Sequence, residues 1–265
     1  MPTLTIDGTP IYYEDKGKGT PVVLLHAFPV NSEMWEAQIE ALSVRHRVIA
    51  PDFRGFGQSA ARGPFTMESL ADDVQILLTK LSTGPVILGG LSMGGYVALA
   101  FAEKYPKLLR GLMLIDTKAE ADDAKAKEGR GKMIELARSQ GGVAVGEAMQ
   151  SKLLSADALA NKPLLVKKLR GLTDGTAAQT IEFALAAMRD RPDRSEVLKS
   201  LAVPVLIVVG DGDVVTPPTG AEAMRKLALK AELVVIRGSG HLTAMEQPEQ
   251  LNSAMERFVS RVLKA

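Results

Sequence analysis

The sequence predicts an α/β protein: a mostly parallel, eight-stranded sheet with helices on both faces and a helical cap inserted into it. Three observations lead to this fold class. Short apolar runs alternate with longer stretches of helical periodicity over most of the 265 residues. Several of these apolar runs are continuous, as in strands buried on both faces of a parallel sheet. One long middle segment, residues 118–200, has no strand-like run.

The first part of the chain alternates strands and helices. In order, the expected elements are a hairpin of strands at residues 4–6 and 11–14, a strand at 21–26, a helix at 32–42, a strand at 47–51, a helix at 66–81, a strand at 86–89, a helix at 98–103 and a strand at 111–116. The turn signal at residues 7–10, Asp-Gly-Thr-Pro, separates the hairpin strands. Asn31 or Ser32 is suited to cap the first helix, and apolar residues recur at helical spacing in the second.

The middle segment predicts a cap of several short helices. It is rich in Ala, Lys, Glu, Leu and Met, and Gly141-Gly142, Pro163 and Gly171 interrupt it. Alternation then resumes with a strand at 204–210, a helix at 218–229, a strand at 233–236 and a helix at 248–263. We therefore expect residues 1–117 and 201–265 to form the core and residues 118–200 the cap.

Composition excludes several classes of function. The net charge of +1, from 32 basic and 31 acidic residues, predicts no nucleic-acid partner and no binding to an anionic membrane. The chain has no cysteine, which rules out disulfides and thiol chemistry and is compatible with a cytoplasmic location. We expect a soluble protein, because neither a signal peptide nor an apolar run long enough to span a bilayer is visible. No glycine cluster has the spacing of a dinucleotide or phosphate loop.

The sequence Gly90-Leu91-Ser92-Met93-Gly94 lies between a strand and a helix. A serine at the apex of so tight a turn stands clear of the sheet, and small residues must flank it because strand and helix nearly collide there. The start of the following helix favours developing negative charge. Ser92 is therefore the candidate nucleophile.

A serine hydroxyl needs a neighbouring base, usually a histidine oriented by a carboxylate. The chain has three histidines. His46, between two arginines, is expected to have a structural role at the surface, and His26 opens a loop suited to supply backbone donors. His241 follows the last strand, where open α/β sheets place their chemistry, and is the favoured base.

Three aspartates are candidates for the carboxylate. Asp211 and Asp213 come directly after the strand at 204–210, and Asp116 ends the strand before the cap. All three are expected at the same edge of the sheet, so strand position alone leaves the choice open.

Together these motifs resemble the α/β-hydrolase superfamily, over almost the whole chain. The matching blocks are residues 26–29, 52–59, 90–95, 210–217 and 238–248. The order Ser92, Asp213, His241 is the order of that family. The resemblance implies Ser92 as nucleophile, His241 as base and Asp213 as acid, with Asp211 as a neighbour and the block at 52–59 as a structural turn.

The resemblance also implies an oxyanion hole made by the backbone N–H groups of Phe28 and Met93. One position departs from the family pattern. Relatives usually carry glycine where this chain has Ala27. If that position requires a positive φ, alanine costs on the order of 1 kcal/mol or shifts the loop.

These assignments predict two-step acyl transfer to water, with no metal and no cofactor. We expect a carboxylesterase acting on short or medium acyl esters, and activity that falls in mild acid because the base must be neutral. The alternatives are an oxoadipate enol-lactonase type of lactone hydrolase, which a buried Arg or Lys facing Ser92 would support, and an acyltransferase or perhydrolase. A different class is a non-catalytic ligand-binding receptor on the same scaffold. The partner is thus a small-molecule ester or lactone; oligomeric state carries no sequence signal.

Apolar residues of the cap are candidates for lining a substrate pocket beside Phe28 and Met93, or for holding the cap helices together. They are Met133, Leu136, Met149, Phe183 and Met188.

Overall fold

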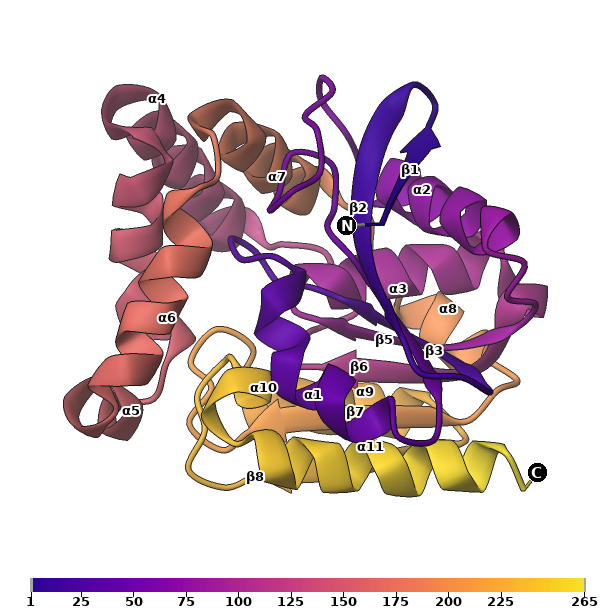
Figure 1. Cartoon of the computed structure of the whole chain (residues 1–265). Helices are drawn as coiled ribbons and strands as arrows, with labels where there is room; N and C mark the ends of the chain where they lie inside the picture. Colours follow the sequence, from indigo (N-terminus) through magenta and orange to yellow (C-terminus); the bar gives the residue numbers. More distant parts are fainter. Residues whose placement is uncertain (1, 265) are drawn as a thin grey trace.

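A computed structural model of the chain describes residues 2–264 and contains one eight-stranded sheet (Figure 1). The strands are β1 (Thr3–Ile6), β2 (Thr9–Lys16), β3 (Pro21–Leu25), β4 (Arg47–Pro51), β5 (Val86–Leu91), β6 (Leu109–Ile115), β7 (Val205–Gly210) and β8 (Ala231–Ile236). Their spatial order is β1-β2-β4-β3-β5-β6-β7-β8. The pairs β1–β2 and β2–β4 are antiparallel, and all later neighbours are parallel. The predicted fold class is confirmed.

Helices cover both faces of this sheet. The helices of the chain are α1 (Glu36–Leu42), α2 (Met67–Lys80), α3 (Met93–Lys104), α4 (Ala124–Leu153), α5 (Ala156–Asn161), α6 (Pro163–Asp174), α7 (Ala178–Asp190), α8 (Ser195–Ser200), α9 (Pro218–Leu227), α10 (Thr243–Glu246) and α11 (Pro248–Val262), with short 3-10 turns at Ser32–Trp35 and Pro106–Leu108. Helices α2, α3 and α9 contribute to one apolar cluster, and α1 and α11 to a second on the opposite face. Alternate residues of β3 divide between the two clusters, so this strand is buried on both sides.

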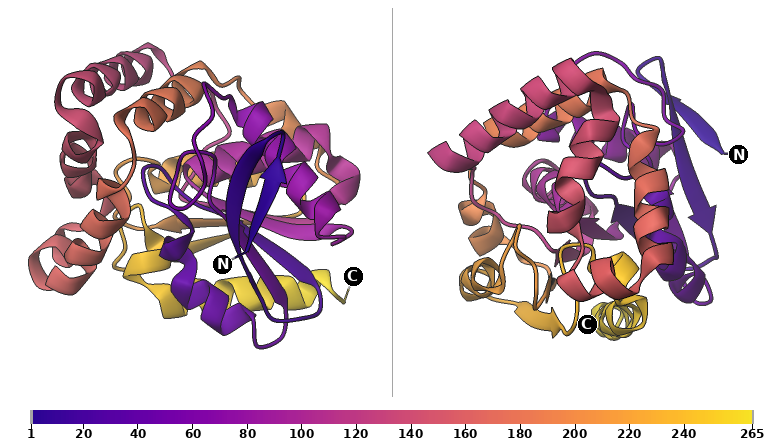
Figure 2. Two further views of the ribbon diagram at one scale, coloured as in Figure 1. Left: turned by 45° about the horizontal axis from the view of Figure 1, so that its top comes forward. Right: turned by 90° about the vertical axis from the view of Figure 1, so that its left-hand side faces the viewer.

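Helices α4 to α7, which lie between β6 and β7 in sequence, gather at the carboxyl edge of the sheet. The right-hand view of Figure 2 shows α4 to α7 in front of the strands. The short helix α8 instead packs against α3 and α9, helices of the sheet layer. The assignment of residues 118–200 to one cap and of 1–117 and 201–265 to the core stays a prediction.

Glycines shape these middle helices unequally. Gly141 has φ 86° and ψ 174° and kinks the long helix α4, because this backbone conformation suits glycine. Gly171, expected to interrupt the segment, lies inside α6. A glycine within a helix costs about 1 kcal/mol relative to alanine, which a packed helix can absorb.

Element boundaries otherwise shift by a few residues. The helix that follows Ser92 begins at once, at Met93, rather than at Ala98. Strand β6 begins at Leu109 because it continues the pairing with Val86 of β5. In residues 2–264 no helix is both long and apolar enough to cross a bilayer.

Candidate active site

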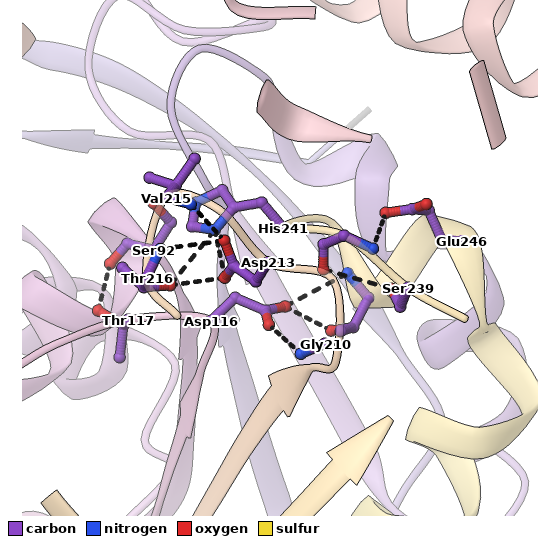
Figure 3. Close-up of polar contacts among 12 residues, drawn as sticks. Ser92, Asp116, Thr117, Gly210, Asp213, Val215, Thr216, Ser239, His241 and Glu246 are labelled. Atoms are coloured by element: carbon purple, nitrogen blue, oxygen red, sulfur yellow. Dashed lines mark hydrogen bonds and ion pairs between the residues drawn. The ribbon is translucent and has the colours of Figure 1, made fainter. Parts of the chain in front are cut away.

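The sequence-predicted site residues follow neighbouring parallel strands at their carboxyl ends. Ser92 follows β5, Asp116 follows β6, Asp213 comes three residues after β7, and His241 lies in the loop after β8. Parallel neighbours end at the same edge, so the sheet brings residues separated by more than a hundred positions to one rim. Figure 3 draws these residues with their polar contacts to one another and to their neighbours.

Ser92 has a strained backbone. Its φ of 54° and ψ of −113° are unusual for a residue with a side chain. Four hydrogen bonds hold it. Its N–H donates to the Ile115 carbonyl at 2.9 Å, and its own carbonyl accepts from Thr117 Oγ1 at 2.8 Å and from the N–H groups of Gly95 and Tyr96 at 2.9 and 3.2 Å. The turn therefore belongs to the sheet on one side and to α3 on the other.

The glycines of the turn are required by close approach. A Cβ at Gly90 would lie 2.2 Å from the Gly94 carbonyl oxygen, and one at Gly94 would lie 2.2 Å from the Leu25 carbonyl oxygen. Backbone cannot give way at such distances. The steric argument made from the sequence motif thus describes the observed turn.

Asp213 and His241 form a buried pair. His241 Nδ1 lies 2.8 Å from Asp213 Oδ2, and both residues are almost fully buried (Figure 3). Thr216 Oγ1 also donates to Asp213 Oδ2, at 2.7 Å. The N–H groups of Val215 and Thr216 donate to Oδ1 at 2.7 and 3.0 Å. The carboxylate is thus held in one orientation by its own turn and presents an oxygen to the imidazole.

These contacts decide the charge of Asp213. Burial by itself raises the pKa of this carboxyl, but the hydrogen bonds from His241 and Thr216 and the proximity of the imidazole outweigh it, so the pKa lies below the usual value. Asp213 is therefore an anion at neutral pH, as a group that stabilises an imidazolium must be.

The other two aspartates do not contact the imidazole. Asp116 Oδ1 accepts from the Gly210 N–H at 2.9 Å, and Oδ2 accepts from Thr243 Oγ1 at 2.6 Å. Burial, with the charge of Asp213 nearby, raises its pKa well above the usual value. Asp211 Oδ1 accepts from the N–H groups of Gly238 and Ser239, and so supports the loop that carries His241. Both therefore brace the backbone around the Asp213–His241 pair.

His26 is bonded at both ring nitrogens. Its Nε2 accepts from the Phe53 N–H at 3.0 Å, and its Nδ1 donates to the Ala27 carbonyl at 2.8 Å. These partners allow only the neutral tautomer with the proton on Nδ1, and burial lowers the pKa of the ring accordingly. His26 joins the loop after β3 to the structural turn at Phe53.

His46 differs from the expectation of a surface residue. It is buried, and burial lowers its pKa. It precedes β4, at the amino edge of the parallel strands, whereas Ser92 is at the carboxyl edge. The two flanking arginines suggested exposure, but exposure of neighbours along a chain does not determine that of the residue between them.

The expected oxyanion donors are Met93, the first residue of α3, and Phe28, in the loop after β3. Ala27 does not have a positive φ: among residues 2–264 the non-glycine residues that do are Asp7, Ser82, Ser92 and Asp116. The backbone strain that a positive φ would impose on Ala27 is therefore absent. The Ala27 N–H donates to Met34 Sδ at 3.2 Å, which fixes the loop just before Phe28.

Sequence reasoning missed Thr216, Thr117 and Glu246. Thr216 holds Asp213, Thr117 holds the carbonyl of Ser92, and Glu246 accepts from the Gly240 N–H, next to His241, at 2.7 Å. Thr216 could have been found, because an Asp side chain commonly accepts from backbone N–H groups that shortly follow it in a turn. In the part of the chain that the structure describes, no group of three His, Asp or Glu side chains is arranged to hold a metal ion.

Comparison with known proteins agrees with this fold. The family model of the alpha/beta hydrolase fold matches residues 20–248. The chain therefore belongs to the α/β-hydrolase family, and it is an enzyme of the hydrolase class, so the alternative of a non-catalytic receptor is dropped.

Three similar proteins show the range of this family. The structure of a thermophilic esterase from Thermogutta terrifontis superposes with a TM-score of 0.93 at 41% identity, covering 96% of this chain and 94% of that one. A 3-oxoadipate enol-lactonase 2 from Acinetobacter baylyi is 28% identical over 98% of this chain and 96% of its own length. A non-heme chloroperoxidase CPO-A1 from Kitasatospora aureofaciens is 31% identical over 98% of this chain and all of its own.

Proposed function

We propose that the protein is a serine carboxylesterase acting on short or medium acyl esters, with Ser92 as nucleophile, His241 as base and Asp213 as the acid that orients it. The observation that carries the proposal is the 2.8 Å contact between His241 Nδ1 and Asp213 Oδ2 at the sheet edge where Ser92 caps a strained turn. The similarity to the Thermogutta terrifontis esterase supports the same reading.

The mechanism has two steps. Ser92 Oγ attacks the ester carbonyl while His241 Nε2 takes its proton, and the resulting imidazolium is stabilised by the Asp213 anion. The imidazolium then protonates the leaving alcohol. Water, deprotonated by the same imidazole, attacks the acyl-enzyme and releases the acid, which regenerates Ser92.

The N–H groups of Met93 and Phe28 are proposed to hold the oxyanion, each worth roughly 3 kcal/mol in the transition state. Met93 is the better supported donor, because the first N–H of a helix has no partner within the helix. The Phe28 donor gains support from the ordinary φ of Ala27.

The apolar cluster that contains Phe28 and Met93 favours an apolar acyl group. The candidate cap residues pack against the same apolar cluster that contains Phe28 and Met93, and Phe183 meets Phe65 edge to face with ring centroids 6.3 Å apart. This supports an uncharged acyl chain in preference to a charged one.

A carboxylate-bearing lactone is less well supported. Within residues 2–264 the buried basic side chains are Arg191 and Arg194. Arg191 pairs with Asp122 and stacks on the Tyr96 ring at 3.8 Å, and Arg194 pairs with two glutamates. Both guanidinium groups thus already face carboxylates of the chain, although the buried Nε of Arg191 has no hydrogen-bond partner. Uncharged lactones remain substrates that the same steps would open.

The test is a panel of chromogenic esters of increasing acyl length, with an enol-lactone beside them, on wild type and Ser92→Ala. We expect turnover of short and medium esters that falls about 10⁶-fold in the variant, and fluorophosphonate labelling at residue 92 only. The melting curves of both proteins provide the control for folding. Turnover that survives in folded Ser92→Ala, or an enol-lactone preferred over every ester, would refute the proposal.

A further inference from the structure

Glu246, the last residue of α10, is a buried acid that the proposed mechanism leaves without a role. It is only 3% exposed. Its Oε1 accepts from the Gly240 N–H at 2.7 Å, and its Oε2 accepts from the Ser155 N–H at 2.9 Å. Gly240 directly precedes His241, while Ser155 caps helix α5 in the segment between β6 and β7. One carboxylate thus joins two backbones that are 85 residues apart in sequence. Figure 3 shows Glu246 beside the loop that carries His241.

The residue on the other side of His241 is bound to the same segment. The Leu242 N–H donates to the Leu153 carbonyl at 3.1 Å. Gly240 also packs directly on that backbone, since a Cβ there would lie 2.6 Å from the Ser155 nitrogen and 2.8 Å from the Leu154 carbonyl carbon. Residues 153–155 therefore contact both neighbours of the imidazole-bearing residue.

The acid at position 246 satisfies backbone donors that have no other acceptor in this contact. Burying a carboxylate is costly, but an apolar residue at this position would leave the N–H groups of Gly240 and Ser155 without this acceptor. Lys162 Nζ, at 2.9 Å, donates to the backbone oxygen of Glu246 rather than to its carboxylate. What a carboxylate provides here is two acceptor oxygens on one rigid plane, which hold two N–H groups facing it from different directions.

We propose that Glu246 is a positioning residue for His241: its carboxylate binds the residue before His241 to residues 153–155. The inference rests on the proposed function, in which His241 is the base. Its consequence is that the imidazole is held from two sides, through Asp213 at the ring and through Glu246 at the backbone.

The test uses a graded pair of variants in the full chain. Glu246→Gln keeps one acceptor oxygen but turns an amide N–H toward the other donor, and Glu246→Met removes both acceptors. We expect kcat to fall about tenfold in the first and about 100-fold in the second, with KM changed less than about threefold. The proton resonance of the His241 Nδ1–H, measured by NMR, should shift or broaden in the same order.

The matched control is Asp73→Asn. Asp73 is a buried carboxylate on α2 that pairs with Arg54 and has no contact with the loop of His241. This variant should lose stability yet keep wild-type kcat and an unchanged imidazole resonance. If Glu246 had only a structural role, its variants would behave in the same way as Asp73→Asn. Because Glu246→Gln is nearly isosteric, its kcat and its imidazole resonance test the inference even if Glu246→Met does not fold.

The outcomes separate the two proposals. Wild-type kcat and an unchanged resonance in both Glu246 variants overturn the inference, and so does an equal loss of kcat in Asp73→Asn. A wild-type protein that neither hydrolyses esters nor reacts with a fluorophosphonate overturns the proposed function instead. In that case the imidazole resonance still reports whether Glu246 positions His241.

Discussion

His26 and His241 are both buried histidines at carboxyl ends of parallel strands, and they differ in what their rings contact. His26 follows β3, and both of its nitrogens are bonded to backbone, at Ala27 and Phe53. His241 follows β8, and its Nδ1 faces Asp213 at 2.8 Å and Thr216 Oγ1 at 3.4 Å. Among residues 2–264 no hydrogen bond reaches the Nε2 of His241, so this nitrogen is free to accept a proton.

The comparison shows that burial and strand position do not by themselves make a base. A ring with both nitrogens bonded to backbone must break a hydrogen bond before it can take a proton. A ring with one nitrogen fixed by a carboxylate and the other free can take a proton and keep its orientation. The same contrast applies to Asp116 and Asp213, since only Asp213 contacts an imidazole.

The largest expected difference is between the two histidines in catalysis. His241→Asn should reduce kcat by about 10⁶-fold, because the variant loses the proposed general base. His26→Asn should leave kcat within about tenfold of wild type, because it acts only through the position of the loop before Phe28. Ester hydrolysis by both purified variants, with folding verified by circular dichroism, measures the contrast. Comparable losses in the two would mean that the roles are shared or exchanged.

The next largest difference in kcat is expected between variants of Asp213 and Asp116. We expect Asp213→Asn to lower kcat by about 10⁴-fold, since an amide can neither stabilise the imidazolium nor enforce its tautomer. Asp116→Asn should stay close to wild type, because its oxygens bond to Gly210 and Thr243 rather than to the ring. Single-turnover kinetics on one ester would compare them. A large loss in Asp116→Asn would show that the choice of acid is wrong.

For stability, the substitution of His26 should have a larger effect than the substitution of His241. His26→Ala removes a packed ring and leaves the buried Phe53 N–H without its acceptor, so the free energy of unfolding should fall by about 2–4 kcal/mol. Urea unfolding provides the measurement, and His241→Asn serves as the comparison, with an expected smaller change. An unaltered midpoint for His26→Ala would mean that water replaces the imidazole at no cost.

The smallest expected effect is a pH dependence of stability from Asp116. Burial and the nearby Asp213 raise the pKa of this carboxyl in the folded state above its value of 3.8 in the unfolded chain, so folding favours the protonated form. Its contribution is complete below about pH 3.8 and is lost as the pH rises through the folded-state pKa. Asp116→Asn mimics the neutral acid, so its stability relative to wild type should rise with pH. Urea unfolding at several pH values gives this difference, and the reverse slope would contradict the assigned direction.

Much of the fold and part of the site could be predicted from the sequence. Continuous apolar runs such as β3 and β7 identify strands buried on both faces, because such strands require apolar residues at every position. The turn at Ser92 is likewise local: Gly90 and Gly94 are needed wherever a strand and a helix approach this closely. Where glycine is merely unfavourable rather than required, as at Gly171, its presence misled the prediction of helix ends.

The amino-acid sequence by itself thus determined the alternation of strands and helices, the strained turn of Ser92 and the set of side chains at the sheet edge, because these depend on residues close in the chain. Only the tertiary structure decided which aspartate meets His241, why His26 is bonded at both nitrogens, and that Glu246 reaches Ser155. Each of those contacts joins segments between 27 and 91 residues apart, and its geometry is set by the packing of the elements between them.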